Sequence, residues 1–176
     1  LGDVYKRQVY EYDLEKNETS TLKVREVLGE YNEADYISKR LWVEVRDGTK
    51  VPVSLVHKRG ITLDRSNPTL LYAYGSYGYS MDATFSSNRL SLLDRGFVFA
   101  IAHIRGGEEM GRSWYENGKL LKKKNTFYDF IDCSKSLIEE GYCSSNNLYA
   151  AGGSAGGLLM GAVINICLLY TSPSPR

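Results

Sequence analysis

Histidine and cysteine are scarce in this sequence, and it has no long apolar run. Only His57 and His103 are present, too few for a histidine-based metal cluster. Cys133, Cys143 and Cys167 make an odd number without metal-ligand spacing, so we expect buried small side chains rather than a disulfide framework. No stretch reaches the roughly 18 apolar residues of a membrane span. The sequence therefore does not predict a histidine-based metal site, a disulfide-rich fold or a membrane-spanning helix.

Charge of one sign is not in excess either. The chain carries 22 Lys and Arg against 21 Asp and Glu, a net charge of +1, which gives no electrostatic argument for a nucleic-acid partner. The run Lys122-Lys123-Lys124 is shorter than the basic clusters that indicate nucleic-acid binding, so we expect a solvated loop. The chain has no secretory signal and begins at Leu1 rather than Met, so we expect a cytoplasmic protein whose N-terminus lies upstream.

The residue pattern predicts strands that alternate with helices. An alternating hairpin over 9–13 and 20–27 is too small to fold alone. The turn Asp47-Gly48 joins predicted strands at 40–45 and 50–57. The further elements are strands at 69–74, 97–104 and 148–151 and helices at 88–95, 126–140 and 158–166. This alternation is typical of a doubly wound α/β sheet.

The strongest chemical signal is Gly152-Gly153-Ser154-Ala155-Gly156. This G-x-S-x-G pattern lies between a predicted strand and a predicted helix, the context of a nucleophile elbow. The turn would crowd the residues two before and two after the serine, and glycine removes that clash because it has no Cβ. A turn that merely packs closely is the alternative. The pattern predicts that Ser154 is a nucleophile.

A serine nucleophile needs a base, and the sequence after the elbow supplies none. Residues 155–176 contain no Asp, Glu or His. α/β-Hydrolases carry their triad in the order Ser, then acid, then His, so His57 and His103 do not fit as base. We expect both histidines to be structural, and we expect the chain alone to be inactive.

Six separated stretches resemble the prolyl oligopeptidase family of serine peptidases, and most closely its oligopeptidase B branch. The resemblance covers residues 9–165. One departure is Glu108, where the family usually carries a third glycine. The stretches are Asp47-Gly48-Thr49-Lys50-Val51-Pro52, 72–78, 104–111, Trp114-Tyr115-Glu116-Asn117-Gly118-Lys119, 122–127 and 152–161.

The resemblance implies a β-propeller paired with an α/β-hydrolase domain. Residues 9–30 would then be the last strands of the propeller, and 36–166 the N-terminal part of the catalytic domain. The acidic segment 29–35 is a plausible linker between them. Both ends, 1–8 and 167–176, resemble translated adapter sequence and are expected to be non-native tails.

The resemblance also implies roles for individual residues. The Ala155 N–H and the Tyr74 hydroxyl would stabilise the oxyanion. The alternative for Tyr74 is a structural role, as a tyrosine packed on the edge of the sheet. Tyr77 and Asp82 would bind substrate. In the oligopeptidase B branch the stretch around Asp82 supplies carboxylates to a subsite for basic residues. Here the second acid is replaced by Thr84, and a solvated loop aspartate is the alternative.

The predicted function is hydrolysis of short peptides, after Arg or Lys, through an acyl-enzyme on Ser154, with no cofactor and no metal. The alternatives are another α/β-hydrolase, such as a prolyl or acylaminoacyl peptidase or an esterase, and a non-catalytic interaction module on a hydrolase scaffold. Arg105 is expected to form a structural ion pair with the neighbouring Glu108 or Glu109.

Overall fold

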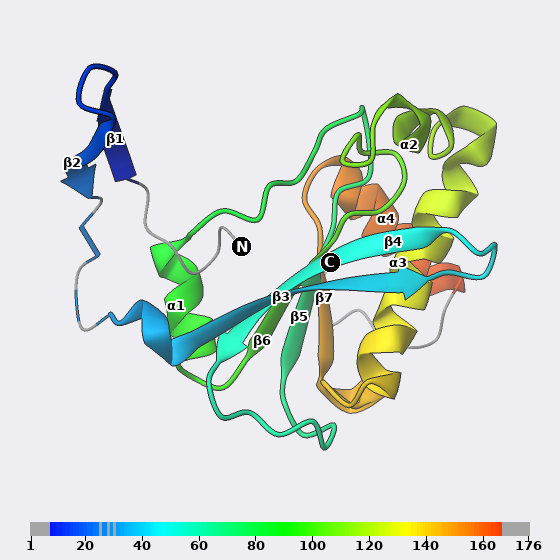
Figure 1. Cartoon of the computed structure of the whole chain (residues 1–176). Coiled ribbons are helices and arrows are strands. Elements are labelled where there is room, and N and C mark those ends of the chain that lie inside the picture. Colours follow the sequence, from blue (N-terminus) through cyan, green and yellow to red (C-terminus); the bar gives the residue numbers. More distant parts are fainter. Residues whose placement is uncertain (1–7, 25, 28, 30, 167–176) are drawn as a thin grey trace.

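A computed structural model describes residues 8–24, 26–27, 29 and 31–166 of the chain. Its main body is a five-stranded mixed sheet in the order β3-β4-β6-β5-β7 (Figure 1). Strands β3, β4 and β6 pair antiparallel, whereas β6, β5 and β7 are parallel. The bounds are β3 Tyr36–Glu44, β4 Lys50–Lys58, β5 Thr69–Tyr72, β6 Val98–Ala102 and β7 Leu148–Ala151.

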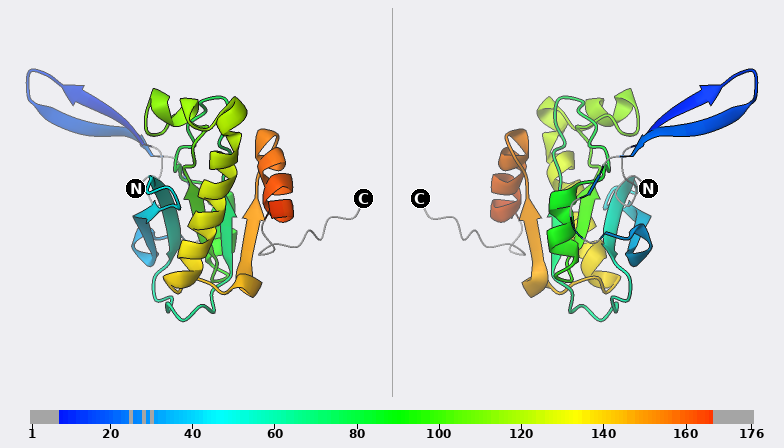
Figure 2. Two further views of the ribbon diagram at one scale, coloured as in Figure 1. Left: turned by 90° about the vertical axis from the view of Figure 1, so that its right-hand side faces the viewer. Right: turned by 90° about the vertical axis from the view of Figure 1, so that its left-hand side faces the viewer.

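The helices lie on both faces of this sheet (Figure 2). Helix α1, Ser87–Leu93, covers one face, and helices α3, Lys123–Glu139, and α4, Ala155–Ile166, cover the other. Helix α2, Arg112–Glu116, lies between β6 and α3 in the chain. Three short 3-10 helices occupy Glu33–Asp35, Leu120–Lys122 and Ser145–Asn147.

The central strand β6 shows why the sheet is double-sided. All five of its residues are buried. Val98, Ala100 and Ala102 belong to the larger core beneath α3 and α4, and Phe99 and Ile101 belong to the smaller core beneath α1. Alternate side chains of a strand point to opposite faces, so an unbroken apolar run is what a strand covered on both faces needs.

The hairpin between β3 and β4 is confirmed. Gly48 has φ +79°, and its N–H donates to the Val45 carbonyl at 2.8 Å. The Asp47 carboxylate accepts the Thr49 N–H at 3.1 Å. Glycine tolerates this left-handed conformation, which explains why Asp-Gly predicts the turn.

Strands β1, Gln8–Asp13, and β2, Glu18–Val24, form a separate two-stranded sheet. Thirteen residues make up these strands, and only Asp13 is even partly buried. Figure 1 draws this hairpin away from the five-stranded sheet. The segments 1–7 and 167–176, which hold nearly all of the two expected non-native tails, lie outside the described residues.

Several details of the expected architecture change. Helix α3 begins at Lys123 rather than at 126, and α2 was not predicted. Cys133 and Cys143 are buried free thiols, as expected, whereas Cys167 lies outside the described residues. None of the helices in the described part of the chain is long and apolar enough to cross a membrane.

Candidate functional site

Ser154 lies in a sharp turn between β7 and α4. Its φ is +54°, a left-handed conformation that non-glycine residues rarely adopt. The strand ends at Ala151 and the helix begins at Ala155, so the turn is only three residues long. Because β7 runs parallel to β5 and β6, the turn lies at the carboxyl edge of these strands. Such backbone strain clusters at functional sites.

The two glycines around Ser154 allow the turn to close. A Cβ on Gly152 would lie 2.5 Å from the Gly156 carbonyl oxygen, as the predicted crowding requires. A Cβ on Gly156 would lie 2.9 Å from the Ala73 carbonyl oxygen. Glycine at 156 therefore lets α4 approach the chain that leaves β5.

The exposed Ser154 side chain is followed by the first N–H groups of α4. The N–H groups of Gly156 and Gly157 donate to the carbonyls of Gly153 and Ser154. The Ala155 N–H has no backbone acceptor among the described residues. A free N–H at a helix N-terminus beside a serine is suited to bind a developing negative charge.

Tyr74 lies next to this elbow. A Cβ on Gly156 would be 3.8 Å from both Cα and Cδ2 of Tyr74. The Tyr74 ring is partly buried and meets Tyr79 edge-on, with 5.7 Å between ring centroids. Tyr77 is 79% exposed and lies 6.5 Å from Tyr74 by ring centroids. The fold therefore brings Tyr74 beside the elbow and leaves Tyr77 open to solvent.

Asp82 lies further along the same loop. It is exposed, and its carbonyl accepts the Thr84 N–H at 3.0 Å. The preceding residue, Met81, donates its N–H to the Glu109 carboxylate at 2.9 Å, which fixes the loop on the segment after β6. No ion pair within the described residues involves Asp82, so its carboxylate faces solvent rather than a cation of the fold.

Both histidines lie in the interior, each 3% exposed. His103 Nε2 lies 2.7 Å from Ser54 Oγ, and its Nδ1 lies 3.7 Å from Glu109 Oε1. His57 Nδ1 lies 2.8 Å from the Lys58 carbonyl, and burial lowers the pKa of His57. Ser54 is itself 3% exposed, so this buried Ser–His–Glu set has no access for a substrate.

The expected partners of Arg105 are wrong. Its guanidinium pairs with Asp129 of α3 and with Asp47 of the β3–β4 turn, at 2.6 Å each. Glu108 pairs instead with Arg112. Burial alone would lower the pKa of Arg105, but hydrogen bonds and charge from the two aspartates outweigh it and raise that pKa.

The expected solvated loop of three lysines is also wrong, because Lys123 opens α3. Its Nζ donates to the Gly75 carbonyl at 2.5 Å and to Ser76 Oγ at 2.8 Å. Gly75 follows Tyr74 directly. The available signal was the helical spacing of the residues just after the lysines, which extends to Lys123 if the helix starts one turn earlier.

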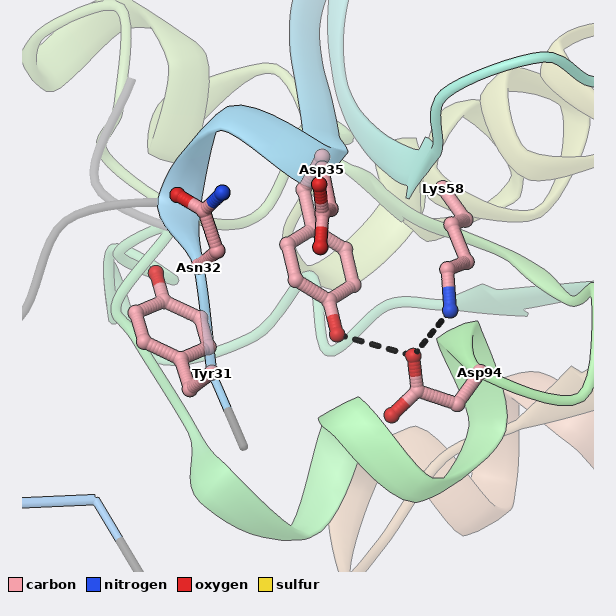
Figure 3. A pocket seen from close by; sticks show the side chains of 6 residues that line it. Tyr31, Asn32, Asp35, Lys58 and Asp94 are labelled. Atoms are coloured by element: carbon pink, nitrogen blue, oxygen red, sulfur yellow. Dashed lines mark hydrogen bonds and ion pairs between the residues drawn. The ribbon is translucent and has the colours of Figure 1, made fainter. Parts of the chain in front are cut away.

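A hollow lies at the β3 edge of the sheet, opposite the β7 edge that carries Ser154 (Figure 3). Its volume is about 610 Å³, and at its centre Asp94 accepts hydrogen bonds from the Tyr36 hydroxyl at 2.8 Å and from Lys58 Nζ at 3.0 Å. Tyr36 begins β3 and Lys58 ends β4, so these contacts hold the entry to the sheet rather than the serine turn. The remaining lining residues are Tyr31, Asn32 and Asp35.

Comparison with known proteins matches this arrangement. Residues 83–167 match the prolyl oligopeptidase family. The chain is 53% identical over 158 residues to dipeptidyl aminopeptidase BI of Pseudoxanthomonas mexicana, covering 89% of this chain and 22% of that protein. It is 47% identical over 154 residues to protease 2 of Moraxella lacunata, covering 88% of this chain and 22% of that protein.

Solved structures agree with these matches. Oligopeptidase B from Trypanosoma brucei with covalently bound antipain superposes with a TM-score of 0.88 at 46% identity, covering 94% of this chain and 23% of that one. Oligopeptidase B from Leishmania major gives 0.87 at 42% identity, covering 94% and 23%. The chain thus spans about a fifth of the length of the curated relatives it matches.

Fold and site together define a mixed α/β protein with a serine held at a strand–turn–helix elbow. The chain belongs to the prolyl oligopeptidase family.

Proposed function

We propose that the complete protein is a serine oligopeptidase of the oligopeptidase B type that cleaves short peptides after Arg or Lys. Residues 36–166 would be the N-terminal part of an α/β-hydrolase domain, and 9–30 the last strands of a propeller. The observation that carries the proposal is the left-handed Ser154 between β7 and α4, with Gly152 and Gly156 beside it. The similarity to protease 2 and to oligopeptidase B structures supports the peptidase class.

In this proposal Ser154 attacks the scissile carbonyl and forms an acyl-enzyme. The Ala155 N–H and the Tyr74 hydroxyl stabilise the oxyanion that forms in the transition state. Tyr77 and Asp82 contact the substrate on the open side of the loop. The base is a histidine that the 176 residues do not include, because His57 and His103 are buried and precede Ser154 and because residues 155–176 contain no Asp, Glu or His. We therefore propose that the 176-residue chain alone does not turn over substrate.

The test is activity-based labelling of the complete protein with a fluorophosphonate probe, followed by assays on arginyl, lysyl and prolyl substrates. Ser154→Ala should abolish both labelling and hydrolysis. Ser145→Ala is the matched control, because Ser145 is exposed in the 3-10 helix at the other end of β7. Absence of labelling in the folded wild type would favour the non-catalytic interaction module. Hydrolysis of simple esters without peptides would favour an esterase.

A second candidate is removal of N-terminal dipeptides, because the relative with 53% identity is named a dipeptidyl aminopeptidase. Peptide substrates with free and with acetylated N-termini distinguish an oligopeptidase from a dipeptidyl aminopeptidase. An oligopeptidase of the proposed type accepts the acetylated peptide, whereas a strict dipeptidyl aminopeptidase requires the free amine.

A further inference from the structure

We propose that Lys123 is a positioning residue that holds the turn carrying Tyr74, and that it acts on oxyanion stabilisation through Tyr74. This inference rests on the proposed function, in which the Tyr74 hydroxyl is an oxyanion donor. Lys123 belongs to α3, whereas Tyr74 follows β5, so the contact joins two elements that meet at the carboxyl edge of the sheet.

The contact is made to the backbone of the turn itself. Lys123 Nζ donates to the carbonyl of Gly75, the residue after Tyr74, and to Oγ of Ser76, which is 8% exposed. Gly75 has φ +64°, and a Cβ there would lie 2.6 Å from Thr126 Cγ2 and 2.7 Å from Ile104 Cγ1. The turn is therefore pressed against α3 and the chain after β6, and the ammonium fixes the direction of its carbonyl.

Lys123 uses its charge differently from its basic neighbours. Lys119 pairs with Glu116 at 2.6 Å, and Arg112 pairs with the same carboxylate. Within the described residues no carboxylate forms an ion pair with Lys123. Burial lowers the pKa of Lys123 to about 8. Its strongest contacts are thus charge-assisted hydrogen bonds to neutral oxygens of the Tyr74 turn.

Helix stability alone does not favour a lysine at this position. The first turn of α3 has no acidic residue, and it carries Lys123 and Lys124 after Lys122 at the N-cap. Cations are unfavourable at a helix N-terminus because they face the positive end of the helix dipole. A side chain that burial and the dipole both disfavour, yet that reaches the backbone beside Tyr74, fits a role in the site better than a role in folding.

The test is a double-mutant cycle in the complete protein, assayed with a fluorogenic arginyl peptide. Lys123→Met should lower kcat about tenfold to a hundredfold, with KM changed less than about threefold, because the turn loses its position in the transition state. Tyr74→Phe should lower kcat on the order of a hundredfold. The double variant should lie within about threefold of Tyr74→Phe, since Lys123 acts through that hydroxyl.

Lys124→Met is the matched control. It removes the same charge from the same helical turn, but the Lys124 side chain is exposed and the hydrogen bonds to the Tyr74 turn come from Lys123, so kcat should stay within about twofold of wild type. The melting temperature of Lys123→Met should stay within about 4 °C of wild type, because relief of the buried charge offsets the lost hydrogen bonds.

Three results would overturn the inference while leaving the proposed function intact. They are fully multiplicative losses in the double variant, a Lys123→Met effect on KM alone, and a loss of activity that only follows a loss of folded protein. A Tyr74→Phe variant with full activity would overturn the role of Tyr74 and this inference with it. A complete protein that cleaves no peptide would overturn the proposed function.

Discussion

Arg105 donates two side-chain hydrogen bonds to the carboxylate of Asp129, at 2.9 and 2.6 Å, and its backbone N–H donates a third at 3.0 Å. Asp129 is 0% exposed and lies in the middle of α3. The fourth nitrogen contact reaches Asp47 in the β3–β4 turn. One guanidinium therefore ties α3, the chain after β6 and a hairpin turn together beneath the serine edge of the sheet.

Removing this cation should strongly destabilise the protein. Arg105→Met leaves the Asp129 carboxylate buried without a partner and should cost about 3–5 kcal/mol in the free energy of unfolding. Urea unfolding followed by the fluorescence of buried Trp114 measures the change. The double variant Arg105→Met/Asp129→Leu should recover part of the loss, and a double variant no more stable than the single one would contradict this explanation.

An added methyl group should change stability in opposite directions at an elbow glycine, Gly152, and at a glycine inside α4, Gly161. Gly152→Ala places a Cβ 2.5 Å from the Gly156 carbonyl, so the turn must open, and stability should fall by about 1–3 kcal/mol. Activity of the complete protein should fall with it, because Ser154 moves. Gly161→Ala meets nothing within 4 Å in the interior of α4 and should stabilise by about 0.5–1 kcal/mol. Thermal unfolding measures the stability of both variants. Equal changes in stability at the two positions would contradict the steric clash between a Cβ at 152 and the Gly156 carbonyl.

Tyr36 should make stability fall in strong alkali. Burial, with the hydrogen bond to Asp94 next in importance, raises the pKa of Tyr36 to about 12. The folded protein therefore keeps this proton between pH 10 and 12 while the unfolded chain loses it, so stability is complete below pH 10 and declines as pH rises towards 12. The decline attributable to Tyr36 is about 2 kcal/mol.

Urea midpoints at pH 9, 10, 11 and 12 measure this effect. Tyr36→Phe should remove the Tyr36 part of the decline, whereas Asp94→Asn should reduce it without removing it, because burial is the larger cause. A Tyr36→Phe protein with the same pH dependence as wild type would show that other groups are responsible.

A single substitution at Thr84 should increase the preference of the complete protein for a basic residue in the substrate. Under the proposed function, Asp82 supplies one carboxylate and Thr84 stands where the oligopeptidase B branch carries another. Thr84→Asp should raise kcat/KM for an Arg-Arg substrate over an Ala-Arg substrate by about tenfold, and Asp82→Asn should lower this ratio. Thr84→Asn is the control of equal size, and an equal gain with asparagine would exclude charge as the cause.

The parts of the fold that depend on local pattern were predictable. The apolar run at 97–104 and the turn at Asp47-Gly48 mark β6 and the β3–β4 hairpin, because burial on two faces and a left-handed turn each demand particular residues. The elbow was predictable for the same reason, since the contact between Gly152 and Gly156 spans only four residues.

Partners far apart in the sequence were not predictable in this way. Arg105 has two acids within four residues, yet it pairs with Asp129 and Asp47 because the sheet and α3 bring them together. Lys123 was expected in a solvated loop because the three-lysine run stands before the apolar helical spacing, which is visible only from residue 126. Its role depends on Gly75, 48 positions away, and only the packing of α3 on the Tyr74 turn reveals it.

The buried set of Ser54, His103 and Glu109 has a consequence for how this protein's chemistry is recognised. A Ser154→Ala variant still contains a serine whose hydroxyl lies 2.7 Å from an imidazole, with a carboxylate on the far side of the ring. A search for a serine, a histidine and a carboxylate in contact would therefore select Ser54, and it would not select Ser154. Ser154 differs from Ser54 in its exposure and its left-handed backbone, and under the proposed function these two features, rather than the presence of the three side-chain types, distinguish the nucleophile from an inert serine.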